Sequence, residues 1–142
     1  MNQNIVCSGA LFYATSTKRF LFLQRTDKKT QGLWGLVGGK SKFTESAFEG
    51  LKREIEEETG SLPKFKKVIP LEMFTSNDQK FFFHTYLVAI DSEFIPKLNQ
   101  EHSGYCWCAF ECWPKNLHMG LKNTLNNKSI KGKLQTILDL IV

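Results

Sequence analysis

The segment from Ser46 to Gly60 constrains this chain most, because it has the local features of a capped amphipathic helix. Ser46 and Glu49 have the spacing of a capping box, and Gly60 is typical of the position just beyond a helix C-terminus. At about 100° per residue, Leu51 and Ile55 lie on one face of the predicted helix. This apolar face is expected to point into the core.

A cluster of carboxylates lies beside that apolar face. Glu54, Glu57 and Glu58 fall within an arc of about 100° on the predicted helix. Two such charges ~5 Å apart repel by ~3 kcal/mol at an effective dielectric constant of about 20, and bound divalent cations would offset this cost. Taken alone, the arc is also consistent with a solvated acidic surface. Ala47 and Gly50 lie in the same arc nearer the N-terminus, so we expect another group to dock against the bare backbone there.

Apolar patterns predict the remaining elements. Strands are expected at residues 4–15, 19–24, 66–75, 79–90 and 105–110, and helices at residues 46–59, 115–126 and 130–141. Residues 33–37 form a short apolar run that ends at the paired glycines, Gly38 and Gly39. The rings of Phe81, Phe82 and Phe83 fall on both faces of their strand, so covering layers are expected on both sides of it. We therefore predict an α/β fold, an α/β/α sandwich with a mixed β-sheet between helices, formed by residues 1–142 as one domain.

The charge distribution favours a cation site that handles an anionic substrate. The chain has a net charge of +5, but residues 40–60 hold four basic and six acidic residues. That segment is therefore at −2 and the rest of the chain at +7, while no block of Lys and Arg marks a nucleic-acid groove. No apolar run approaches the ~20 residues of a membrane-spanning helix, and the N-terminus lacks the pattern of a secretory signal. We expect a cytoplasmic protein with no membrane partner.

Residues 39–61 resemble the signature of the Nudix (MutT-type) hydrolase family. The matching positions are Gly39, Glu45, Arg53, Glu54, Ile55, Glu57, Glu58 and Gly60. Ser61 stands where the family usually has an aliphatic residue, and Val37 and Thr44 replace a frequent Pro and a frequent Gly. These departures concern the shape of the loop and not the carboxylates.

The resemblance implies an enzyme that uses water to cut the pyrophosphate of a nucleoside diphosphate linked to another moiety. The implied metal ligands are Gly39, through its carbonyl, and the catalytic carboxylates Glu54, Glu57 and Glu58. Arg53 is implied as a catalytic residue that, together with Glu45, fixes the helix and its loop, and Gly60 as structural support. Mg²⁺ is the expected cofactor, with Mn²⁺ as the alternative.

Residues outside the signature complete the expected site. Glu101 lies on a predicted loop before a late strand, where many relatives carry the general base, so we expect it to be the base and a further metal ligand. His102 is the alternative base. Arg25 and Lys40 are expected to bind phosphate, and Asn123 a base edge. Candidates for stacking a nucleobase are Trp34, Phe81, Phe83, Tyr86 and Trp107, although such rings more often belong to the core.

The prediction for function is a Mg²⁺-dependent nucleotide pyrophosphohydrolase. The favoured substrate is a (deoxy)nucleoside triphosphate, followed by a small nucleotide of the ADP-ribose type. One alternative is an RNA 5′-end pyrophosphohydrolase, although nucleic acid is not the expected partner. Another is a non-catalytic Nudix domain that senses a ligand, which the intact set of carboxylates disfavours. A homodimer is left open.

Overall fold

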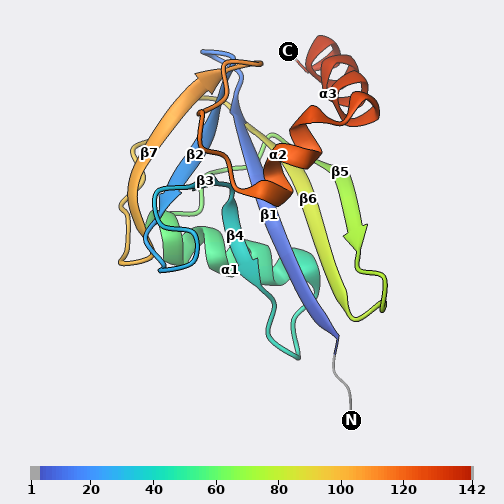
Figure 1. The fold of residues 1–142 in the computed structure, drawn as a ribbon. Helices are drawn as coiled ribbons and strands as arrows, with labels where there is room; N and C mark the ends of the chain where they lie inside the picture. The colour runs from blue at the N-terminus through green and yellow to red at the C-terminus, as the bar shows by residue number, and fades with distance from the viewer. Residues whose placement is uncertain (1–3, 142) are drawn as a thin grey trace.

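The computed structural model describes residues 4–141. The predicted absence of a secretory signal rests partly on residues 1–3, which lie outside this range, as does residue 142. The chain forms a mixed seven-stranded sheet with helices on both faces (Figure 1). The elements are β1 (Ile5–Ala14), β2 (Arg19–Arg25), β3 (Trp34–Gly35), β4 (Val37–Lys40), α1 (Ala47–Thr59), β5 (Lys67–Thr75), β6 (Phe81–Ile90), β7 (His102–Ala109), α2 (Met119–Asn126) and α3 (Lys128–Leu140). The predicted α/β/α sandwich is confirmed.

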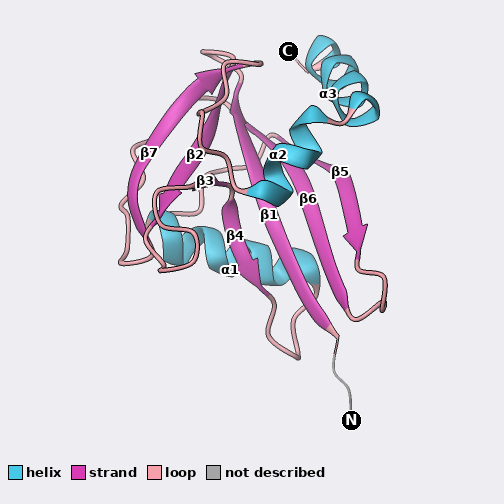
Figure 2. Ribbon diagram, in the orientation of Figure 1, coloured by secondary structure: helices cyan, strands magenta, loops and turns pink. Residues whose placement is uncertain are grey.

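Strand β1 is the centre of the sheet, and its two edges have different partners. One edge pairs in parallel with β6 over residues 5–14. The other edge pairs with β4 over residues 7–10 and with β2 at residues 13–14. Because β2 also pairs with β3 and β7, the sheet divides into two arms, one ending in β4 and the other in β2, β3 and β7 (Figure 2).

Helix α1 covers one face of the sheet and begins and ends as its sequence predicts. The Ser46 Oγ accepts a hydrogen bond from the Glu49 amide, and the Glu49 carboxylate accepts one from the Ser46 amide, which completes the capping box. Gly60 ends the helix in the left-handed conformation, with φ of 76°. Leu51 and Ile55 are fully buried in the core between α1 and the sheet. This packing fixes the rotation of the helix and therefore the direction of its acidic face.

Helices α2 and α3 cover the opposite face. Leu121 and Leu125 of α2 and Leu134 of α3 pack with Phe20 and Phe22 in a second core. None of the helices in residues 4–141 is long and apolar enough to cross a membrane.

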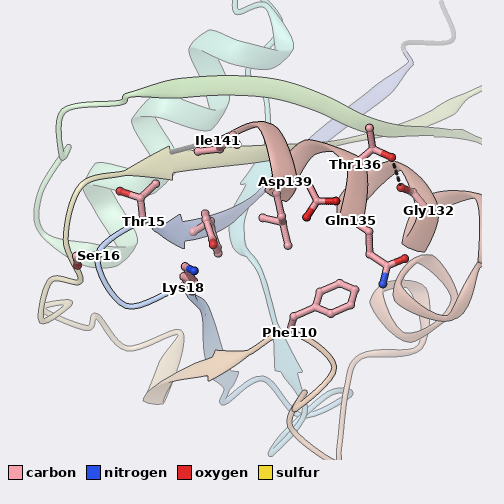
Figure 3. Close-up of a pocket in the computed structure, with 11 residues that line it drawn as sticks. Thr15, Ser16, Lys18, Phe110, Gly132, Gln135, Thr136, Asp139 and Ile141 are labelled. Carbon is pink, nitrogen blue, oxygen red and sulfur yellow. Dashed lines mark hydrogen bonds between the residues drawn. The ribbon is translucent and has the colours of Figure 1, made fainter.

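An open hollow separates α3 from the turn between β1 and β2 (Figure 3). Lys18, Phe110, Gln135 and Asp139 are among its lining residues, which include none of the acidic residues of the signature.

Four sequence predictions need correction. The helix expected from residue 115 begins at Met119, because Trp34 donates a hydrogen bond to the Asn116 carbonyl and accepts one from the His118 amide, which holds this segment extended. Strand β4, which contains the paired glycines, was not expected, and β7 begins three residues early, at His102. The rings from Phe81 to Phe83 are only partly buried, since they lie at the start of β6.

Candidate functional site

Strand β4 brings its paired glycines against the acidic face of α1. The Gly38 amide donates a hydrogen bond of 2.9 Å to the Glu58 carboxylate. A Cβ atom on Gly39 would lie only 2.7 Å from the Glu54 carboxyl carbon, so this position accepts no larger residue without a shift. Glycine therefore allows a close approach between backbone and carboxylate, and a larger residue would displace the Glu54 carboxylate.

Arg53 is the centre of an ion-pair network along α1. It donates two hydrogen bonds to the Glu45 carboxylate, at 2.8 and 3.0 Å, and others to Glu54 and Glu57. A further bond to the Lys40 carbonyl ties the guanidinium to the end of β4. The hydrogen bonds from Arg53 lower the pKa of Glu45 to about 2. A backbone amide in the loop that precedes Glu45 also donates to its carboxylate and makes a smaller contribution in the same direction. The network orients three signature carboxylates and, through Glu45, holds the loop between β4 and α1.

Glu58 is the most deeply placed carboxylate of the site. It is 4% exposed, and burial raises its pKa to about 9, against the lowering effect of the Gly38 amide; Glu101 and Glu54 raise it further. Burial also raises the pKa of Glu54. Several carboxylates thus share a partly desolvated space with one guanidinium, and this arrangement favours either a bound proton or a bound cation.

The loop between β6 and β7 and the first residue of β7 bring two further side chains to this cluster. Ligand atoms of Glu58, Glu101 and His102 all lie within 4.8 Å of one another. Glu101 is exposed, whereas His102 is 7% exposed and its Nδ1 atom is buried without a hydrogen-bond partner. Burial lowers the pKa of His102, and the charge of Arg25 lowers it further.

This loop is attached to the C-terminal end of α1. The Lys97 amide donates a hydrogen bond to the Thr59 carbonyl, and the Asn99 side chain donates one to the Glu57 carbonyl. The Asn99 Oδ1 atom in turn accepts the amide of Glu101 at 3.0 Å. The loop therefore places Glu101 relative to α1 through direct bonds, although these segments are far apart in the sequence.

The donor set fits a divalent cation. Carboxylate and carbonyl oxygens are the ligands that Mg²⁺ and Mn²⁺ prefer, and the residues that would supply them are Gly39, Glu54, Glu57, Glu58 and Glu101. Burial raises the pKa of the Glu58 carboxyl, and a bound cation would act in the opposite direction by favouring the ionised carboxylate. The roles of these residues remain predictions.

The predicted substrate-binding residues are dispersed. Arg25 donates hydrogen bonds to the Asp27 carboxylate and to the Thr30 hydroxyl, at 3.1 and 2.8 Å. Lys40 is exposed at the end of β4, beside the signature loop. Asn123 is exposed on α2, on the face of the sheet opposite α1 (Figure 1), and no hydrogen bond within residues 4–141 connects its side chain to the acids. Their roles also remain predictions.

The structure separates the aromatic candidates into two groups. Trp107 and Tyr86 pack on the core beneath α1, and the Trp107 indole donates a hydrogen bond to the Phe94 carbonyl. Phe81 and Phe83, on the other face, form a partly exposed row with Phe74, with ring centroids 6.3 and 6.5 Å apart along the row. Phe74 was missed at the sequence level, and its signal would have been its pairing with Phe83 across neighbouring strands. Trp34 packs against the second core.

The predicted docking surface at the N-terminal half of α1 is wrong. Gly50 is buried against the chain itself, and a Cβ there would lie 2.3 Å from the Ser41 Oγ and 3.0 Å from the Ser41 Cα. Ser8 donates a hydrogen bond to the Ala47 carbonyl from β1. The small residues of this arc therefore allow the helix to approach β1 and the end of β4, and leave no space for a ligand.

Comparisons with known proteins agree with this geometry. A family model described as NUDIX domain matches residues 5–127. Nudix hydrolase 6 of Arabidopsis thaliana is 41% identical over 63 residues, 43% of this chain and 22% of that protein, so the match spans about a fifth of the relative's length.

A MutT NUDIX hydrolase from Burkholderia pseudomallei is 26% identical, with a TM-score of 0.71 over 89% of this chain and 98% of that one. An ADP-ribose pyrophosphatase from Streptococcus suis shares the fold at 20% identity, with a TM-score of 0.66 over 94% and 92% of the two chains.

Proposed function

The chain belongs to the Nudix hydrolase family, and we propose that it is a Mg²⁺-dependent pyrophosphohydrolase of small nucleotides. The observation that carries this proposal is the convergence of Glu54, Glu58 and Glu101 beside the paired glycines of β4. Mn²⁺ is the alternative cofactor. The preferred substrate is a (deoxy)nucleoside triphosphate, followed by a nucleotide of the ADP-ribose type.

In this proposal the residues of the site have distinct tasks. Glu54, Glu57 and Glu58 hold the cation, and Arg53 keeps two of these carboxylates in place. A bound divalent cation would neutralise the pyrophosphate and lower the pKa of a coordinated water. Glu101 lies at the exposed edge of the cluster, where its carboxylate can orient the attacking water and accept its proton.

The aromatic row supports a substrate that contains a base. Lys40, Cys7, Phe83 and Phe74 are successive partners across β4, β1, β6 and β5. Three strand spacings of about 4.8 Å place the end of this row roughly 14 Å from the end of β4. Partly exposed rings at that distance offer a surface on which a nucleobase could stack while its phosphates lie near Lys40.

A phosphate-release assay over a panel of nucleotides tests the proposal. We expect turnover of at least one pyrophosphate with Mg²⁺ and none after exhaustive chelation. Glu57→Gln and Glu58→Gln should each lower kcat by ~10²-fold or more, as expected for loss of a key electrostatic contact in the transition state. Glu56→Gln is the matched control, because Glu56 is an exposed neighbour on α1 outside the network. Activity that survives chelation, or equal rates in all three variants, would contradict the proposal.

A further inference from the structure

We propose that His102 supplies an imidazole nitrogen to a divalent transition-metal ion, in a site completed by Glu58 and Glu101. This inference rests on the proposed metal-dependent function but goes beyond it, because the signature carboxylates alone provide only oxygen ligands. It assigns to His102 a direct contact with the ion, in place of the alternative role of general base.

The first argument is geometric. One ligand atom from each of the three side chains lies within 4.8 Å of the other two, which is the spacing of donors around a single cation. The three residues come from the end of α1, the loop before β7 and the first position of β7. The bonds of Asn99 to both segments hold these elements together, so the cluster does not depend on a chance contact between mobile side chains.

The second argument is the buried and unpartnered nitrogen of His102. The residue is 7% exposed, yet its Nδ1 atom has no hydrogen-bond partner among the described residues. Leaving such an atom unsatisfied is costly, so buried polar atoms without partners are rare. A histidine that only filled the core would be expected to pair this atom, whereas a histidine that binds a metal uses one ring nitrogen as a ligand and leaves it outside the protein's hydrogen bonds.

The third argument is the chemistry of the donors. Imidazole is a common ligand of Zn²⁺, Co²⁺ and related transition ions, whereas Mg²⁺ is bound mainly by oxygen. The imidazole therefore makes this position a better site for a transition ion such as Mn²⁺, the alternative cofactor of the proposed function, than oxygen ligands alone would. Mn²⁺ accepts both donor types and is paramagnetic, so it is a suitable probe.

Electron spin-echo spectroscopy of the full-length protein with Mn²⁺ alone tests the assignment. We expect nitrogen modulation from a directly bound imidazole, and a change to the ¹⁵N pattern when the protein carries ¹⁵N-labelled histidine. The modulation should persist in the double variant His84→Gln/His118→Gln, in which His102 is the remaining histidine. This part of the test leaves the buried residue unchanged, so it does not depend on whether a variant at His102 folds.

His102→Gln completes the test. It should abolish the nitrogen modulation and weaken Mn²⁺ binding at least about tenfold, while Mg²⁺ binding changes less. Bound Mn²⁺ without histidine modulation would overturn the inference and leave the proposed function intact. Modulation that survives in His102→Gln, or disappears in the double variant, would also overturn it. Absence of Mn²⁺ binding would count against the inference and the metal-dependent function together, whereas histidine modulation in a protein without turnover would contradict only the function.

Discussion

Glu58 combines deep burial with a carboxyl pKa of about 9, and this makes the stability of the metal-free protein depend on pH. In the unfolded chain a glutamate loses its proton near pH 4.3. Between the two values the folded state keeps a proton that the unfolded state has lost, so the free energy of unfolding should fall as pH rises from about 5 to about 9. The slope can reach about 1.4 kcal/mol per pH unit.

Urea unfolding in the presence of a chelator checks this prediction. Glu58→Gln should flatten the dependence on pH, because its amide does not titrate, whereas Glu56→Gln should leave the slope unchanged. Saturating Mg²⁺ should remove the decline, since a bound cation favours the ionised carboxylate. A wild-type stability that stayed constant from pH 5 to pH 9 would show that Glu58 is ionised without metal.

Glu101 and His102 make separable kinetic predictions. Glu101→Gln should lower kcat far more than it raises KM, because activation of water matters only on the way to the transition state. Gln100→Ala, at the exposed neighbouring position, serves as the control. Steady-state kinetics with Mg²⁺ should also show a smaller loss for His102→Gln. The opposite ranking, with near-normal kcat in Glu101→Gln, would make His102 the base.

At the scale of elements, two helical glycines predict opposite effects of the same substitution. A Cβ on Gly50 of α1 would overlap the Ser41 side chain, whereas one on Gly132 of α3 would meet nothing within 4 Å. Glycine in a helix interior normally costs roughly 0.5–1 kcal/mol relative to alanine. Gly132→Ala should therefore raise Tm, and Gly50→Ala should lower it. Thermal unfolding measures both, and a higher Tm for Gly50→Ala would show that α1 is less tightly seated than described.

The sequence predicted elements well where the information is local. Ser46, Glu49 and Gly60 define the ends of α1 through contacts within a few residues, and the structure has these ends. Strand β4 and the start of α2 were missed because they depend on pairing with distant segments, β1 and β3. Gly50 was misread for the same reason, since its neighbour Ser41 approaches only in the folded chain. In the site, the pairing of Arg53 with Glu45 was expected, whereas the proximity of His102 to Glu58 required knowledge of where the loop between β6 and β7 lies.

At the scale of the whole molecule, the charge is divided between an acidic segment and a basic remainder, and this predicts how KM responds to salt. The net charge is +5, although residues 40–60 are at −2. A small nucleotide can contact few basic side chains at once, so raising NaCl from about 50 to about 200 mM should increase its KM by less than about tenfold. A triphosphorylated RNA used as substrate would contact several phosphates and show a steeper dependence. Efficient turnover of RNA with that steep dependence would favour the alternative of an RNA 5′-end hydrolase.

The attachment of residues 97–101 to the end of α1 also indicates where this protein could be re-engineered. The bonds from Lys97 and Asn99 to helix carbonyls fix the distal half of the loop, together with the acid that it carries. Ile95 lies just before this half of the loop and is 83% exposed, so residues inserted there would extend into solvent. Loop-length libraries inserted at Ile95 should diversify the surface beside the site while the spacing between Glu101 and Glu58 is retained. Helix α1 and residues 97–101 together form a unit that could be transferred to another protein of the same fold. The transferred unit would keep its arrangement of acidic side chains.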